Sequence, residues 1–155
     1  MRKFLIAALL VLATLATTAP AEAAPTRKQV AQQVTMERVY GPLYGKYKGK
    51  HNLDWNKNGC SVPYQVISHP GVRAVVKAYG SFFQPSCDRH DFGYRNHKVS
   101  GYSRAKVDAR FRDNMIHQCK AKDWPGPDAV AEVPCIAAAK TFYAGVRAGG
   151  WAFWP

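Results

Sequence analysis

The sequence lacks an apolar run long enough to cross a bilayer, which takes about 20 residues. Its longest run extends from residue 4 to about residue 15 and is followed by Thr and Pro residues, which argues against a membrane anchor. Two basic residues precede this run, and small residues ending in the sequence AEA follow it. This layout predicts that residues 1–23 are a secretory signal peptide and that the protein is secreted.

Repeats and low-complexity stretches are also absent. The predicted mature chain, residues 24–155, has about 130 residues, which is enough to bury one hydrophobic core and too few for two. We therefore expect one domain, in a monomeric protein.

Acidic residues are scarce. Ten Asp and Glu residues stand against 22 Lys and Arg residues, so the formal net charge is +12. Such a surface attracts polyanions, and both an anionic lipid surface and nucleic acid have the required charge. We expect no nucleic acid as partner, because no motif interleaves aromatic and basic residues in the manner of a nucleic-acid-binding module.

Cysteine is limited to four residues, Cys60, Cys87, Cys119 and Cys135. An even number in an exported domain predicts two disulfides, for which three pairings are possible. Cys87 and His90 have the spacing of zinc ligands, but no second closely spaced pair follows, which argues against a zinc site.

The pattern of apolar residues predicts an all-α fold, a small helical domain with long N-terminal loops. The loops occupy residues 45–59, where Gly, Asn and Lys are frequent, and the stretch 72–83 is compatible with a helix or a strand. Helices are predicted at 28–44 with an interruption at Gly41-Pro42, from residue 87 to about 97 with Ser86 as N-cap, at 104–119 and at 129–147.

One carboxylate in the predicted helix 104–119 lies in an unusual place. Helical spacing puts Asp108 on the same face as three apolar residues of that helix. Burying a carboxylate there is costly unless a partner satisfies it, which predicts a partner from another segment. A surface ion pair with Arg104 or Arg112, one turn away, is the alternative.

The sequence CDRHDFGYRN, residues 87–96, places His90 beside Asp91. Neighbouring helical residues point about 100° apart, so Asp91 is poorly placed to orient the His90 imidazole. The simplest account is that His90 pairs with Asp108 across two packed, antiparallel central helices. Asp91 is then free to face a cation.

A histidine held by a buried carboxylate is a general base toward water. No serine stands in a nucleophile elbow and no free cysteine is expected, so water is the predicted attacking group. A hard cation held by Asp91 and loop oxygens would stabilise the oxyanion. These residues together predict a hydrolase.

The His-Asp motif, the later Asp108, the four cysteines and the upstream sequence LDWNKNGCS resemble the small secreted phospholipase A2 family of bacteria and fungi. The resemblance covers residues 53–135, most of the mature chain, and the His-Asp motif is its specific part. It implies an all-α fold, a Ca²⁺ cofactor, and hydrolysis of the sn-2 ester of glycerophospholipids at a membrane or micelle surface.

Carried over to this sequence, the resemblance makes His90 the general base, Asp108 its orienting partner and Asp91 a calcium ligand. It places the other calcium ligands at Asn58 and Gly59, where the family usually has a carboxylate and a carbonyl. An amide at position 58 carries no charge, so weaker calcium binding is expected unless Asp54 or the substrate phosphate compensates.

The resemblance also implies the disulfide pairing, Cys60 with Cys87 and Cys119 with Cys135. The first of these would tie the calcium loop to the catalytic helix.

The amide at Asn58 keeps a second hypothesis open, a cationic membrane-binding or membrane-disrupting protein of the same fold with weak or no catalysis. Two further segments have open roles. We expect residues 72–83 to be additional core rather than a lipid-contacting flap, whereas the Trp-rich tail 149–154 suits packing and interfacial contact equally.

Overall fold

The computed structural model describes residues 23–60, 70–124 and 128–154. Every regular element in these ranges is helical, which confirms the predicted fold class. The predicted signal peptide lies outside the described residues except for Ala23, and no helix within them has the length and hydropathy of a membrane span. The elements are α1 (Arg27–Met36), α2 (Leu43–Tyr47), α3 (Pro70–Arg95), α4 (His97–Ser100), α5 (Arg104–Ala121), α6 (Asp128–Gly149) and the 3₁₀ helix η1 (Gly150–Phe153).

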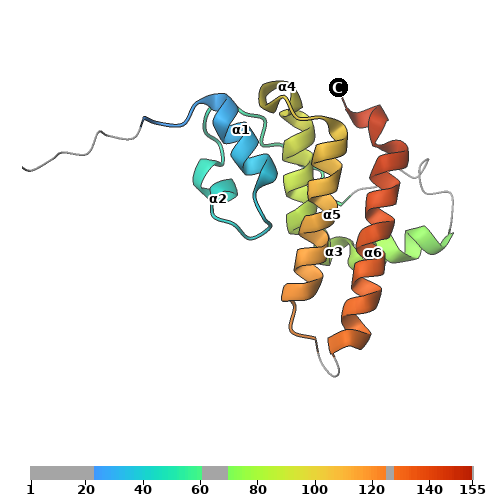
Figure 1. Ribbon diagram of the computed structural model, residues 1–155. Coiled ribbons are helices and arrows are strands. Elements are labelled where there is room, and N and C mark those ends of the chain that lie inside the picture. The colour runs from blue at the N-terminus through green and yellow to red at the C-terminus, as the bar shows by residue number, and fades with distance from the viewer. Residues whose placement is uncertain (1–22, 61–69, 125–127, 155) are drawn as a thin grey trace, which may run out of the picture.

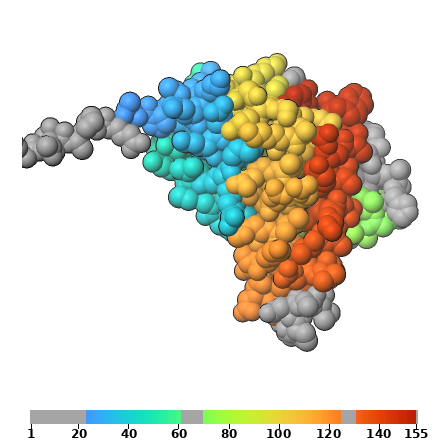
Figure 2. Space-filling model, viewed as in Figure 1, coloured from blue at the N-terminus to red at the C-terminus, as the bar shows by residue number. Residues whose placement is uncertain are grey.

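The second half of α3 and α5 form the predicted antiparallel pair, joined through the short α4 (Figure 1). Helix α6 packs along α5 on one side, and α1 and α2 lie on the other side. The space-filling view shows α1 against α4 and α5 on one face of the molecule (Figure 2). The main core between the long helices consists of Phe83, Cys87, Phe111, Met115, Cys119, Cys135, Ala138, Ala139 and Phe142.

Helix α5 forms where the sequence predicts it. Ser103 caps its N-terminus by accepting a hydrogen bond from the backbone N–H of Lys106. Asp108 is buried on the same face as the apolar residues of this helix, whereas Asp113 is exposed.

The prediction for α3 was wrong at its beginning. The helix starts at Pro70 rather than at residue 87, and Ser86 is not a cap but a buried residue whose hydroxyl donates to Gln118 on α5. Pro85 lies inside the helix, which changes direction between its first and second halves (Figure 1). The stretch 72–83 is thus helical, and residues such as Val76 and Phe83 pack into the core, as expected.

The single early helix predicted at 28–44 is two helices, α1 and α2. The first helix ends at Met36, with Glu37 as its C-cap, so the break comes earlier than the predicted Gly41-Pro42. The Glu37 side chain contacts the second helix instead. Its carboxylate accepts hydrogen bonds from the backbone N–H groups of Leu43 and Tyr44 and so caps the start of α2. Glu37 is itself buried, which fixes the turn between the two helices.

The C-terminal segment both packs and faces solvent. Helix α6 buries Ala139 and Phe142, whereas Val133 is exposed. Helix η1 follows at Gly150, and Trp151 and Phe153 are more than half exposed. The next residue, Trp154, packs against Tyr94 and His97.

Both disulfides have the pairing that the resemblance implies, Cys60–Cys87 and Cys119–Cys135. They close separations of 27 and 16 residues, each worth roughly 3 kcal/mol in the chain-entropy account. The second joins the C-terminal half of α5 to α6 and supports their packing.

Gly93 permits a close approach of three helices. A Cβ atom at this position of α3 would lie 2.6 Å from Val107 Cγ1 of α5 and 3.1 Å from Thr35 Cγ2 of α1. Glycine in a helix normally costs stability, so its presence here reflects packing.

We expect Gly93→Ala to lower the free energy of unfolding by about 1–3 kcal/mol, because the added methyl group forces α3 and α5 apart. The matched control is Gly145→Ala in α6, where no atom lies within 4 Å of the added Cβ. The control is expected to raise the free energy of unfolding by up to about 1 kcal/mol. Urea unfolding measures both, and equal effects of the two substitutions would contradict the packing account.

Candidate active site

The structure brings His90 and Asp108 together. His90 Nε2 lies 2.9 Å from Asp108 Oδ1, across the packed helices α3 and α5. The Asp108 side chain is fully buried, and that of His90 is 9% exposed. The dyad predicted from the apolar stripe is therefore formed.

The His90 ring is held by aromatic side chains. It stacks on Phe111 with ring centroids 4.4 Å apart and lies 4.2 Å from the ring of Tyr94. Because Asp108 is an acceptor, the neutral imidazole carries its proton on Nε2 and leaves Nδ1 with a lone pair. No described residue hydrogen-bonds to that Nδ1 atom.

Asp108 binds more than the histidine. The Tyr94 hydroxyl donates to Oδ1 at 2.7 Å, and the guanidinium of Arg147, from α6, donates to Oδ2 at 2.7 Å. Arg104 also donates to Oδ2, at 3.4 Å, and to the carbonyl oxygen of Val146 at 3.0 Å. Of the three partners considered from sequence, His90 and Arg104 both contact Asp108, whereas Arg112 pairs with Asp113.

These contacts shift the pKa values of the Asp108 carboxyl group and the Tyr94 hydroxyl group. Burial alone would raise the pKa of Asp108, but hydrogen bonds from His90, Tyr94 and Arg147 outweigh it and lower that pKa below its ordinary value. Burial and the hydrogen bond to Asp108 raise the pKa of the Tyr94 hydroxyl. Asp108 therefore stays ionised at neutral pH, and Tyr94 stays a hydrogen-bond donor.

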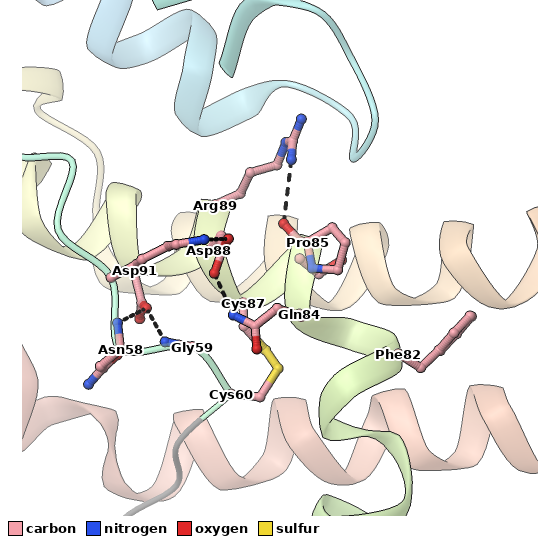
Figure 3. The surroundings of a disulfide bond; sticks show 12 residues. Asn58, Gly59, Cys60, Phe82, Gln84, Pro85, Cys87, Asp88, Arg89 and Asp91 are labelled. Carbon is pink, nitrogen blue, oxygen red and sulfur yellow. Dashed lines mark hydrogen bonds and ion pairs between the residues drawn. A yellow bond between two sulfur atoms is a disulfide. The ribbon is translucent and has the colours of Figure 1, made fainter. Parts of the chain in front are cut away.

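The loop at Asn58 and Gly59 contacts Asp91, the residue that follows His90. Asp91 Oδ2 accepts hydrogen bonds from the backbone N–H groups of Asn58 at 2.9 Å and Gly59 at 3.0 Å (Figure 3). The adjacent disulfide, Cys60–Cys87, fixes this loop to α3 one turn before Asp91. The three residues predicted as metal ligands are therefore neighbours.

Gly59 is required at its position. Its φ of +68° is unfavourable for other residues, and a Cβ atom would lie 2.8 Å from the Gln84 side-chain nitrogen. The loop therefore packs closely against α3 at Gly59.

The Asn58 side chain also faces Asp91. With its amide turned to satisfy both groups, its nitrogen donates to the two carboxylate oxygens at 2.9 and 3.0 Å. Burial raises the pKa of Asp91, and the N–H groups of Asn58 and Gly59 oppose this. Among the described residues, no three His, Cys, Asp or Glu side chains are grouped as a metal site, so any cation here would depend on amide and carbonyl oxygens.

A model of the family described as prokaryotic phospholipase A2 matches residues 35–150 of the chain. The chain belongs to this family. The matched residues include the whole of the α3–α5 pair and the loop that contacts Asp91. The resemblance found in the sequence is thereby confirmed.

Two fungal relatives are each named secretory phospholipase A2. One, from Beauveria bassiana, is 35% identical over 119 residues, which are 72% of this chain and 53% of the relative. The other, from Arthroderma benhamiae, is 34% identical over 102 residues, which are 63% of this chain and 60% of the relative. The chain thus spans between half and two thirds of the length of these relatives.

Two residues that hydrogen-bond to Asp108, Tyr94 and Arg147, were not predicted from the sequence. Tyr94 is one turn after His90, a spacing that indicates a shared helix face. No sequence signal marks Arg147, because its contact depends on how α6 packs. Asp88 and Arg89 are both buried, Asp88 beside Lys57 and Gln84, and Arg89 beside Glu37.

We expect Arg147→Gln to change the acid unfolding of the protein. Asp108 adds stability that is fully present above its unfolded-state pKa, near 3.8, and is lost as pH falls through its lower folded-state pKa. Removing the Arg147 donor brings the folded-state pKa closer to the unfolded one. Between about pH 5 and pH 2 the wild type should therefore lose more stability than the variant.

Urea unfolding across that pH range measures the effect. Lys140→Gln, which removes one charge from an exposed position on α6, is the matched control and should lose stability as the wild type does. The same pH dependence in wild type and Arg147→Gln would show that Arg147 has no influence on the Asp108 carboxylate.

Proposed function

We propose that the protein is a secreted, calcium-dependent phospholipase A2 that hydrolyses the sn-2 ester of glycerophospholipids. The observation that carries the proposal is the 2.9 Å contact between His90 Nε2 and the buried Asp108, which leaves Nδ1 as the basic atom. Family membership supports the reaction class, and the residues matched by the family model, 35–150, include both His90 and Asp108.

In the proposed mechanism, His90 Nδ1 accepts a proton from water as the water oxygen attacks the sn-2 carbonyl carbon. The Asp108 carboxylate, ionised and held by Tyr94 and Arg147, stabilises the imidazolium that forms. The imidazolium then returns the proton to the departing glycerol oxygen, so His90 ends each cycle neutral. General-base catalysis of this kind contributes typically about 10²- to 10⁴-fold to rate.

The residues near Asp91 fit a calcium ion, although weakly. Asp91 supplies one carboxylate, and Asn58 can turn its amide so that the oxygen faces the same place. Gly59 would add its carbonyl oxygen. A bound Ca²⁺ would polarise the ester carbonyl and stabilise the oxyanion. With a single carboxylate, and with backbone N–H groups directed at it, this set predicts lower affinity than a set with two carboxylates.

Secretion and a lipid partner follow from the same proposal. Residues 1–23 have the layout of a signal peptide, the domain contains two disulfides, and both relatives are named secretory. The net charge of +12 favours an anionic phospholipid surface. The exposed rings of Trp151 and Phe153 neighbour Trp154, which contacts Tyr94, so they suit contact with lipid beside the dyad. We expect the protein to act as a monomer.

The environment of Asp91 also favours a second candidate function. The carboxylate already accepts two backbone hydrogen bonds, and Asn58 brings no second charge. A protein of this fold that binds and disrupts anionic membranes without turnover is therefore the alternative. It would release dye from anionic vesicles without releasing fatty acid.

We expect purified protein to release fatty acid from phospholipid vesicles, and His90→Ala to abolish this release because the proton acceptor is lost. Excess chelator should lower the rate of the wild type. His51→Asn is the matched control, since His51 has a φ of +61° that asparagine tolerates and makes no contact with the dyad. Full activity of His90→Ala would end the proposed mechanism.

Asn58→Asp tests the calcium ligands. A second carboxylate facing Asp91 should raise calcium affinity, on the order of tenfold, because binding strength rises with ligand charge. Calcium titrations of fatty-acid release should show higher activity and half-maximal rate at lower calcium than in the wild type. An unchanged calcium requirement would remove Asn58 from the ligand set.

A further inference from the structure

A cavity of about 260 Å³ lies between the segment that follows α1 and one face of α5. We call it the basic cavity. Arg110, His117 and Lys120 line it at three- and seven-residue spacings along α5, and Arg38 lines it from the opposite wall. Figure 2 shows the face of the molecule on which the residues after α1 meet α5.

The charge of the basic cavity is strongly positive. Its lining holds one acidic residue, Asp113, whose carboxylate accepts hydrogen bonds from Arg112 Nε at 2.9 Å and from an Arg112 terminal nitrogen at 2.7 Å. Arg112 therefore offsets this acid. Among the described residues, no other acidic side chain lines the cavity beside Arg38, Arg110 and Lys120, of which Arg38 and Lys120 are exposed.

The walls of the cavity are held in place. Asn114 is buried and bridges them, because its Oδ1 accepts from the Val39 N–H at 2.9 Å and its Nδ2 donates to the Glu37 carbonyl at 3.3 Å. The Arg110 guanidinium donates to the carbonyl of Met36, at the end of α1. The basic groups are thus presented by a preformed frame.

One donor at the cavity lacks an acceptor. Arg110 Nε is buried and has no hydrogen-bond partner among the described residues. A buried donor without an acceptor is costly, so the Arg110 guanidinium is incompletely satisfied by the chain. Burial lowers the pKa of the His117 imidazole, and the positive charges of Arg38 and Arg110 add to this effect.

We propose that the basic cavity is a binding site for a phosphate group, held by charge-assisted hydrogen bonds from Arg38, Arg110 and Lys120. The phosphate oxygens would accept hydrogen bonds from the guanidinium and ammonium groups, whose geometry suits phosphate. His117 lies nine residues after Asp108, or about 180° around α5. The phosphate site and the dyad are therefore on opposite sides of this helix, and the site does not depend on the proposed lipid hydrolysis.

The test uses the full mature protein, with inorganic phosphate as the soluble probe. We expect the His117 imidazole signals to shift on titration with up to about 10 mM phosphate, and calorimetry to give the same dissociation constant. Arg38→Gln with Lys120→Gln should weaken binding by at least about tenfold. Neither side chain makes a hydrogen bond that the fold requires among the described residues, so the variant should fold, which circular dichroism verifies.

The matched control is Arg27→Gln with Lys140→Gln, which removes the same charge from two exposed positions away from the cavity. It should bind phosphate as the wild type does. Absence of binding by the wild type, or an equal loss in the control, overturns the proposal.

A second arm separates a soluble phosphate from a lipid headgroup. Vesicles of phosphatidylcholine with phosphatidic acid, which has a phosphate monoester, are compared with vesicles that contain the same fraction of phosphatidylglycerol. Tighter binding to the phosphatidic acid vesicles that the cavity variant loses identifies a headgroup site. Cavity-dependent binding of inorganic phosphate with no such vesicle preference identifies a soluble ligand.

Discussion

The packing of the three long helices depends on one buried charge, the carboxylate of Asp108. Asp108 has no solvent contact, so its ionised form requires donors from the chain, and these come from three helices. His90 and Tyr94 approach it from α3, Arg104 from α5 itself, and Arg147 from α6. Isolated burial of such a charge would cost several kcal/mol, so the pairing of the long helices and the ionisation of Asp108 depend on each other.

The same arrangement constrains the orientation of the His90 ring. The His90 ring is fixed on one edge by Asp108 and on its faces by Phe111 and Tyr94. The side chain that would move a proton therefore loses little conformational entropy in reaching a reactive geometry. The residues that hold the fold together and those that would perform the chemistry are largely the same, so substitutions at Asp108 will affect both.

Much of this site could be predicted from local pattern, and the rest could not for physical reasons. Asp108 was recognisable because a carboxylate in an apolar stripe demands a partner, and His90 was the available one. Arg147 was not recognisable, because an arginine near a helix end has the same local pattern whether it faces solvent or a buried acid. The N-terminal boundary of α3 was misplaced because Pro85 normally interrupts a helix, whereas here burial of Phe83 and Cys87 outweighs that cost.

The tie between Cys60 and Cys87 has a consequence for the cell that makes the protein. The position of the loop against Asp91 is secured by a covalent bond that forms only where thiols are oxidised. In the reducing cytoplasm the nascent chain would lack that bond, and its loop would be held against α3 by non-covalent contacts, among them the hydrogen bonds to Asp91 and the Lys57–Asp88 ion pair. The position of the loop against Asp91 is therefore coupled to the redox state of the compartment in which the protein folds.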